Sequence, residues 1–177
     1  MSSHSIRLGI IGAGRPGYQH ARGALACGGY RITAVADLSA ARRDRFAAEF
    51  STVARFDDAE KLLKSADVDA VVVALPNDLH APVACAALRA GKHVLVEPPP
   101  AINAREARKI AAAAQRSGKT LLYAFQRRFG GAEQAARLAV RKGYAGTVYH
   151  ARAQWLRTRG ADALAPWSRK RPSAGGG

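Results

Sequence analysis

Cysteine and long apolar runs are both scarce in this sequence. Its two cysteines, Cys27 and Cys85, lie far apart and form no Cys-x-x-Cys pair or Cys/His cluster, which argues against a disulfide framework or a metal site. We expect both to be small core residues in a cytoplasmic protein. No apolar run approaches the roughly 20 residues that cross a bilayer, and the short N-terminal one ends in glycines, unlike a secretory signal.

Acidic residues are scarce in the second half of the chain. Residues 1–100 hold 12 Lys/Arg and 10 Asp/Glu, whereas residues 101–177 hold 16 and 3. A basic half can indicate a nucleic acid or another acidic partner. However, the sequence shows no aromatic-interleaved groove, zinc site or recognition-helix pattern. We therefore favour the alternative that the balancing acidic surface belongs to protein outside this sequence.

Short β-branched runs alternate with helical patterns over the first 125 residues. This alternation predicts βαβ units, and hence an α/β fold with a doubly wound parallel Rossmann sheet. A helix over 81–90 should end at Gly91, and Gly118 should close the helix that follows residue 103. The strands are expected at 7–11, 31–36, 53–56, 70–75, 93–96 and 120–125. Three further helix starts are predicted by polar caps: Ser39, Asp57 with Glu60, and Asn103 with Glu106.

The pattern changes after residue 125. A helix is expected over 130–142, followed by a half-buried strand over 148–156 that has no partner strand later in the sequence. We interpret residues 1–125 as a dinucleotide-binding domain and 126–177 as the beginning of a second, incomplete α/β domain with an open sheet. An unpaired strand of this kind could join a second copy into a homo-oligomer.

A glycine motif follows the first expected strand. Gly12, Gly14 and Gly17 form Gly-x-Gly-x-x-Gly between a strand and a helix, and Asp37 ends the second strand 20 residues later. In this context the glycines permit a tight turn, close approach of a pyrophosphate and close helix packing. Asp37 suits the free ribose hydroxyls of NAD and would repel the 2′-phosphate of NADP, so NAD is the predicted cofactor.

Arg15 and Pro16 stand between the second and third glycines of the motif and are predicted to bind the cofactor with them. Proline is well tolerated at a helix start but has no N–H group. If that amide normally contacts a pyrophosphate, its loss removes one donor, at a cost of ~1 kcal/mol or more.

Four segments give the sequence a family resemblance: "LGIIGAG", "DVDAVVVALPNDLHAPVACAALRAGKHVLVE", "AREARKIAAAAQRSGKTLLYAFQRRF" and "GYAGTVYHARA". They resemble the Gfo/Idh/MocA oxidoreductases, relatives of glucose–fructose oxidoreductase and inositol dehydrogenase. The resemblance implies a Rossmann domain followed by a larger α/β domain that shapes the substrate pocket and mediates oligomerisation. It also implies hydride transfer between NAD(P) and a secondary alcohol of a sugar or cyclic polyol.

The same resemblance places six residues near the nicotinamide half of the cofactor. Leu75, Pro76, Asn77 and His80 would lie along it, Glu97 near its ribose, and Gln126 at the crossing into the second domain. The alternative for His80 is an ordinary histidine at a helix start, and the alternative for Asn77 is a helix cap, which does not exclude contact with the cofactor.

Two departures from the family pattern leave the catalytic residues unknown. The family has Glu-Lys-Pro after this strand, with the lysine assisting proton movement, whereas this chain has Pro98 after Glu97. Lys92 and Tyr123 are the nearest alternatives in sequence, and neither is a convincing substitute. The family also continues past a glycine run to an Asp and a His near the substrate, but this sequence ends at Gly177, which suggests a truncated chain.

Two functions therefore remain open. The chain is an NAD-dependent polyol or sugar dehydrogenase, or a fragment of one. Alternatively, it is a module that holds NAD(H) without doing chemistry. The missing lysine and second domain favour the second for the isolated chain, and the family resemblance favours the first.

Overall fold

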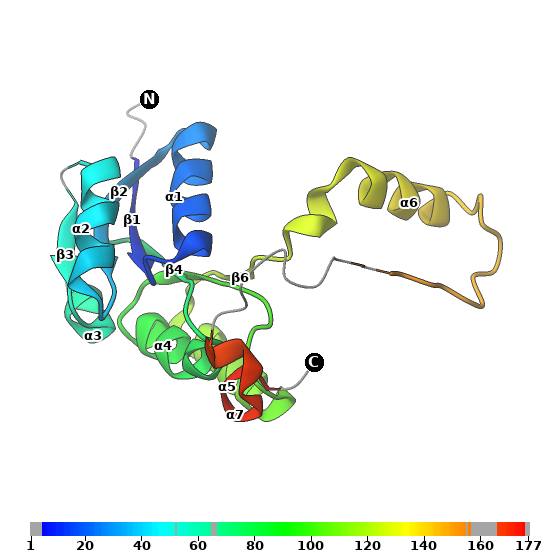
Figure 1. Ribbon diagram of the computed structural model, residues 1–177. Helices are drawn as coiled ribbons and strands as arrows, with labels where there is room; N and C mark the ends of the chain where they lie inside the picture. The colour runs from blue at the N-terminus through cyan, green and yellow to red at the C-terminus, as the bar shows by residue number, and fades with distance from the viewer. Residues whose placement is uncertain (1–4, 52, 65–66, 155, 157–165, 176–177) are drawn as a thin grey trace. The chain divides into compact units, whose positions relative to one another are not determined.

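The computed structural model describes residues 5–51, 53–64, 67–154, 156 and 166–175. These residues divide into two compact units, one of residues 1–124 with 166–177 and one of residues 125–165. The first unit is built on a parallel sheet (Figure 1). Its strands are β1 (Ile6–Ile11), β2 (Tyr30–Ala36), β3 (Ala54–Phe56), β4 (Ala70–Val73), β5 (His93–Val96) and β6 (Leu121–Tyr123).

The sheet has the strand order β3-β2-β1-β4-β5-β6, and every pairing is parallel. The chain builds outward from β1 through β2 to β3, then crosses back and builds outward from β4 to β6. The predicted doubly wound Rossmann sheet is confirmed. The direction of winding reverses between β1 and β4, and in open α/β sheets ligands bind at the carboxyl end of the strands beside such a reversal.

Helices cover the two faces of the sheet in separate groups. On one face α1 and α2 pack over β1, β2 and Val72 of β4, around Phe46 and Phe50. On the other face α3, α4 and α5 pack over β4 and β5, around Leu88 and Ile110. The bounds of these helices are α1 (Arg15–Cys27), α2 (Ala40–Glu49), α3 (Ala59–Leu63), α4 (Asn77–Arg89) and α5 (Ala104–Ser117).

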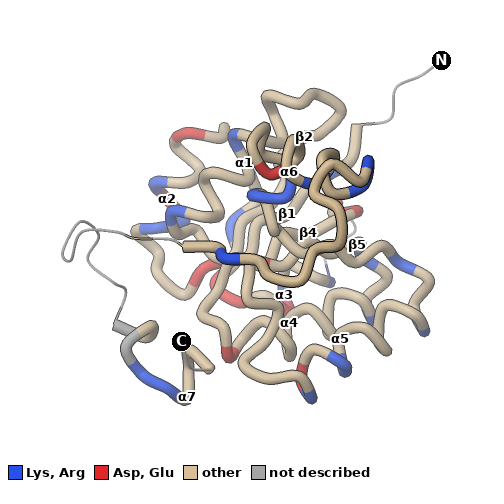
Figure 2. Tube along the Cα trace, turned by 90° about the vertical axis from the view of Figure 1, so that its right-hand side faces the viewer, with Lys and Arg blue, Asp and Glu red and all other residues tan. Residues whose placement is uncertain are grey.

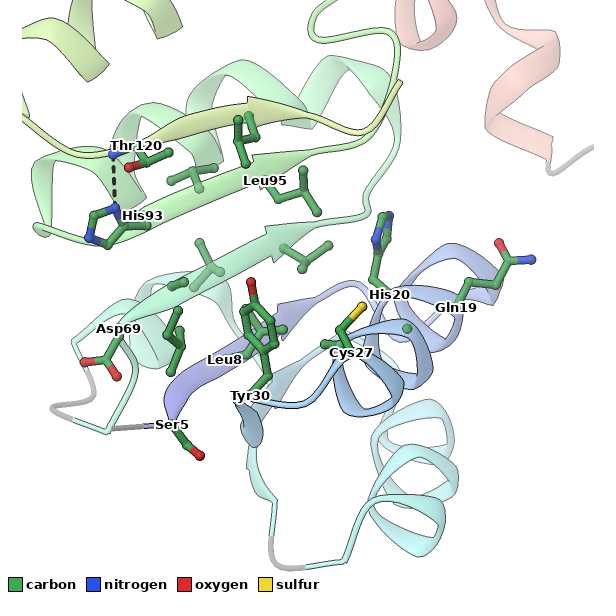
Figure 3. Close-up of a pocket in the computed structure, with 18 residues that line it drawn as sticks. Ser5, Leu8, Gln19, His20, Cys27, Tyr30, Asp69, His93, Leu95 and Thr120 are labelled. Carbon is green, nitrogen blue, oxygen red and sulfur yellow. Dashed lines mark hydrogen bonds between the residues drawn. The ribbon is translucent and has the colours of Figure 1, made fainter. Parts of the chain in front are cut away.

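A groove of about 770 Å³ runs along the α1 face of the sheet, beside α1 and over β4, β5 and β6 (Figure 3). Its floor is apolar and includes Val72, Leu95 and Leu122, and Leu122 is 58% exposed. At one end of the groove the amide of Thr120 donates to Nδ1 of His93 over 3.1 Å, which joins the starts of β5 and β6. This groove lies on the face of the sheet, whereas a dinucleotide is expected at its carboxyl edge.

Helix starts follow the predicted capping chemistry with two corrections. Ser39 and Asn103 accept from amides three residues on, as predicted. The third cap is Asp58, not Asp57, because the Asp58 carboxylate accepts from the amides of Glu60 and Lys61, whereas Asp57 pairs with the Lys61 side chain over 2.8 Å. Helix α4 begins at Asn77 rather than at 81. Its buried residues begin only at His80, so the apolar pattern from which the start was predicted misses the first residues of the helix.

The second unit holds a short 3₁₀ helix, η1 (Gln126–Phe129), and helix α6 (Gly131–Arg141). The predicted helix over 130–142 is confirmed. The predicted strand over 148–156 is wrong for its described residues, 148–154 and 156, which form no strand. No strand in the described part of the chain pairs with them, and Tyr149 and Leu156 are almost fully exposed.

The two cysteines differ from one another. Cys85 is buried as predicted, but Cys27 is exposed, because it is the last residue of α1 and lies at the edge of the groove. Lys and Arg are spread over several elements, α2 and α5 among them (Figure 2). Among the described residues, no helix is long and apolar enough to cross a membrane, and no group of His, Cys, Asp and Glu is placed to hold a metal ion.

An ion pair joins β1 to the residue that precedes β4. Nε and Nη2 of Arg7 donate to the two carboxylate oxygens of Asp69, over 2.9 and 2.6 Å, and the Arg7 backbone amide adds a third bond of 2.9 Å. These bonds hold the pKa of the Asp69 carboxyl well below its usual range. The pair ties the two central strands together at their amino-terminal ends.

We expect Asp69→Asn to lower the free energy of unfolding by about 1 kcal/mol at pH 7, because Asp69 is 39% exposed and solvent weakens the pair. A lowered folded-state pKa stabilises the protein above the unfolded-state value, near pH 4, and that stabilisation is lost as the pH falls further. Urea unfolding at pH 7 and near pH 3 should show the difference shrinking in acid. A difference that grows in acid would contradict the assignment, and the more exposed Asp67 offers Asp67→Asn as a weaker control.

Candidate functional site

The glycine motif forms a tight turn at the carboxyl end of β1, beside the reversal of the sheet. Gly12 has φ of +103°, and a Cβ there would lie 2.2 Å from the carbonyl oxygen of Ala74. A Cβ on Gly17 would lie 2.1 Å from the carbonyl oxygen of Gly12. These two glycines are therefore required by close backbone packing. Gly14 differs, because its nearest neighbour would be Cδ of Pro16 at 3.8 Å, so open space lies over it.

Helix α1 begins directly after this turn, with Gly14 as its N-cap and no side chain capping it. The first amides of a helix have no carbonyl partner within the helix, and the helix dipole favours an anion there. Pro16 is the second residue of α1 and supplies no N–H, while Arg15 brings a positive charge to the same turn. The uncapped helix start and the open space over Gly14 fit the diphosphate of a dinucleotide.

Asp37 lies just past the end of β2, and its carboxylate supports the glycine turn. One oxygen accepts from the amide of Ala13 over 3.0 Å and the other from the amide of Ser39 over 2.9 Å. The side chain is only 10% exposed, and Nη1 of Arg42 lies 3.8 Å away. The sequence predicts Asp37 as a ribose ligand, and the structure adds that it holds the turn in shape.

The segment after β4 lies across the β1/β4 reversal from the glycine turn. Leu75 and Pro76 connect β4 to α4, and the Ala74 amide donates to the carbonyl of Ile11 over 2.8 Å. Asn77 is the first residue of α4, and its Nδ2 donates to the Ala174 carbonyl over 2.9 Å. Ala174 ends the short helix α7 (Arg171–Ala174), which follows the 3₁₀ turn η2 (Pro166–Arg169). The structure thus brings the segment that leads into the C-terminal glycine run against Asn77.

His80 is buried, with 1% of its surface exposed. Its Nδ1 lies 2.8 Å from the Pro99 carbonyl oxygen, and its Nε2 lies 2.8 Å from the Leu75 carbonyl oxygen. Both neighbours are acceptors, and a neutral imidazole has one N–H to donate. This geometry favours a supporting role, in which His80 connects the loop after β4 to the loop of three prolines after β5, residues 98–100, here called the proline loop. Its direct contact with a cofactor stays a prediction.

Glu97 follows β5 directly, and its side chain makes a contact that the sequence analysis missed. Its Oε1 lies 2.5 Å from Nε2 of His20 on α1, and both side chains are 22% exposed. His20 comes three residues after Gly17, which places it on the sheet-facing side of α1, at the end of the groove (Figure 3). That spacing is the one sequence signal that could have identified it.

The proline loop holds no lysine. The two residues considered as substitutes, Lys92 and Tyr123, lie in different places. Lys92 precedes β5 and its Nζ donates to the Val68 carbonyl, so it stands at the opposite end of the strand from Glu97. Tyr123 ends β6 beside Val96 and packs against the α4 and α5 core. Burial raises the pKa of the Tyr123 hydroxyl. The position of Lys92 excludes it as a substitute at Pro98.

The carboxyl edge of the sheet thus gathers nearly all the residues predicted from the sequence. Gln126 is exposed and begins η1 in the second unit, so its part in the site stays a prediction. The edge brings together the motif residues, Asp37 and the residues after β4 and β5: Gly12, Gly14, Arg15, Pro16, Gly17, Asp37, Leu75, Pro76, Asn77, His80 and Glu97. Their contacts with a cofactor stay predictions.

Comparison with known proteins adds relatives along most of the chain. It is 32% identical to D-glucoside 3-dehydrogenase of Escherichia coli over 99% of its length, which covers 50% of that protein. It is 35% identical to 1,5-anhydro-D-fructose reductase of Ensifer adhaerens over 97% of its length, covering 51% of that protein. The chain therefore spans about half the length of the curated relatives it matches.

Solved structures share the same fold. Scyllo-inositol dehydrogenase from Lactobacillus casei with bound NAD(H) and scyllo-inositol matches with a TM-score of 0.75 and 28% identity, over 80% of this chain and 42% of that one. The apo form of that enzyme matches with a TM-score of 0.77 at the same identity, over 82% and 44%. Residues 6–125 match the model of the Gfo/Idh/MocA family, described as an oxidoreductase family with an NAD-binding Rossmann fold. The chain belongs to the Gfo/Idh/MocA oxidoreductase family.

Proposed function

We propose that this chain is the NAD(H)-binding half of an oxidoreductase that acts on a secondary alcohol of a sugar or cyclic polyol. The observation that carries this proposal is the set of residues gathered at the carboxyl edge of the sheet, at the reversal between β1 and β4. There an uncapped helix start, open space over Gly14 and the Asp37 carboxylate lie at one edge of the sheet. A bound nicotinamide would exchange a hydride with the carbinol carbon, while the hydroxyl proton passes to a base.

The relatives support the class of substrate. Their names include a D-glucoside 3-dehydrogenase, a 1,5-anhydro-D-fructose reductase and inositol 2-dehydrogenases, all of which act on a ring that bears hydroxyl groups. Relatives with different ring substrates are expected if they share the cofactor-binding half and differ in a second domain that determines which ring is bound.

We propose NAD(H) rather than NADP(H) as the cofactor. The carboxylate of Asp37 can accept from the ribose hydroxyls of NAD and would repel a 2′-phosphate. Arg42 is the residue that favours the alternative, because its guanidinium lies close enough to Asp37 to pair with a phosphate if that carboxylate were absent.

A non-catalytic NAD(H)-binding module is the second candidate, and Pro98 is the observation that favours it. Proline cannot carry a proton, and general acid–base assistance contributes about 10²–10⁴ in rate. Lys92 lies at the far end of β5, so it cannot take the place of the lysine that the family has at this position.

The full 177-residue chain should bind NADH and should not turn over a panel of polyols. Binding is measured by nicotinamide fluorescence, and turnover by NADH formation with NAD and myo-inositol, scyllo-inositol or D-glucose. Binding without turnover is expected, because this chain spans about half the length of its relatives and has Pro98 where the family has a lysine. Turnover would show that Pro98 is no obstacle, and failure to bind NADH would overturn the proposed function.

Retention on heparin with a steep salt dependence would instead favour the nucleic-acid hypothesis.

A further inference from the structure

His20 and Glu97 connect two elements that are far apart in the sequence. Their 2.5 Å contact joins α1, which begins at the glycine turn, to the end of β5. The backbone of Glu97 is fixed as well, because its amide donates to the Val73 carbonyl over 3.1 Å. A glutamate just past a strand end would otherwise sample several rotamers, so this contact selects one of them.

Glu97 lies on the other side of the β1/β4 reversal from the glycine turn. The glycine turn and Asp37 lie at the ends of β1 and β2, and Glu97 lies beyond β4, at the end of β5. A dinucleotide bound across the reversal places one nucleoside on each side of it. In the described part of the chain, Oε1 of Glu97 is engaged by His20, and Oε2 makes no hydrogen bond. One carboxylate oxygen therefore remains for a ligand hydroxyl.

We propose that His20 is a positioning residue for the nicotinamide nucleoside: it holds the Glu97 carboxylate so that Oε2 faces the crevice and accepts from a ribose hydroxyl. The inference rests on the proposed function, because it needs a dinucleotide in the crevice. It goes further by linking the helix that receives the phosphates to the recognition of the nicotinamide end. The contact acts through Glu97, so His20 itself need not touch the cofactor.

The test compares a ligand that carries the nicotinamide nucleoside with one that lacks it. NADH and ADP are titrated by calorimetry against the 177-residue chain and its variants. His20→Leu and Glu97→Gln are each expected to weaken NADH about tenfold, the effect of one charge-assisted hydrogen bond, while ADP affinity stays within about twofold. His20→Gln retains an N–H donor at a similar reach and should restore most of the NADH affinity.

The double variant His20→Leu/Glu97→Gln should bind NADH no more weakly than the worse single variant, because both changes remove the same interaction. Equal losses for NADH and ADP would indicate a purely structural role and overturn the proposal. An unchanged NADH affinity in His20→Leu, or losses that add in the double variant, would overturn it too. If the unaltered chain binds ADP but not NADH, this inference fails while the phosphate site stands. If it binds neither ligand, the proposed function fails with it.

Discussion

Gly14→Ala is expected to weaken NADH binding about 100-fold and leave folding intact, whereas Gly17→Ala is expected to destabilise the fold itself. The backbone of Gly14 has φ of −86° and ψ of −178°, which alanine adopts readily, and its added Cβ would meet nothing nearer than 3.8 Å. That methyl group would project into the space left for the diphosphate. The change in unfolding free energy should therefore stay within about 0.5 kcal/mol.

Gly17→Ala places a methyl carbon 2.1 Å from the Gly12 carbonyl oxygen, and backbone cannot move aside as a flexible side chain can. We expect a loss of about 3 kcal/mol in unfolding free energy, the upper range for overpacking, and a loss of NADH binding with it. Urea unfolding followed by circular dichroism measures the first effect, and nicotinamide fluorescence measures the second.

Gly23→Ala is the matched control on the same helix, because a Cβ there meets nothing within 4 Å. It should stabilise the protein by up to about 1 kcal/mol through helix propensity and leave NADH binding unchanged. If Gly14→Ala binds NADH as tightly as the unaltered chain, the diphosphate does not pass over Gly14, and the proposed site is wrong.

Asp37→Ala is expected to reverse the choice of cofactor. The unaltered chain should bind NADH at least about tenfold more tightly than NADPH, because the Asp37 carboxylate repels a 2′-phosphate. Removing that charge leaves Arg42, 3.8 Å away, without its acidic neighbour. NADPH should then bind about tenfold more tightly than before and NADH about tenfold more weakly.

Two further variants separate charge from support of the turn. Asp37→Asn retains an oxygen that can accept from the Ala13 amide, so it removes the repulsion while keeping one of the two backbone bonds. It should gain NADPH affinity with little loss of stability. Asp37→Ala/Arg42→Ala should lose the gain for NADPH, since the phosphate then has no guanidinium. A preference for NADPH in the unaltered chain would contradict the assignment of Asp37.

The regular part of the fold could be predicted because each strand is a short apolar run between turn signals. The β4 and β5 runs are covered by helices at Val71, Val73, Val94 and Val96, so their continuous hydrophobicity reflects the environment that the sheet provides. The helix caps at Ser39 and Asn103 are equally local. Asp57 and Asp58 show the limit of such reasoning, because both are residues that cap helices and only the structure shows that Asp58 does so.

The remaining features depend on contacts between distant parts of the chain. Nothing near Glu97 in the sequence indicates His20, because the two meet only when β5 is placed beside β4. The strand predicted over 148–156 is wrong for a related reason. Alternation of apolar and polar residues specifies a strand only when another strand pairs with it, and no described strand does so here. The carbonyl oxygens beside the buried His80 belong to Leu75 and Pro99, in two different loops, so the sequence alone does not show that both meet this side chain.

The order of strand pairing in the central sheet also determines at what stage of folding the cofactor site can form. β1 can pair with β2 as soon as about 36 residues have been made, but its other partner is β4, with Ile11 beside Val73. Contacts between such distant residues form slowly, because a long loop must close first. The close packing of the Ala74 carbonyl against Gly12 is therefore absent from a nascent chain that does not yet include Ala74. A dinucleotide can stabilise only the finished sheet, so it would act late in folding, by binding the native state.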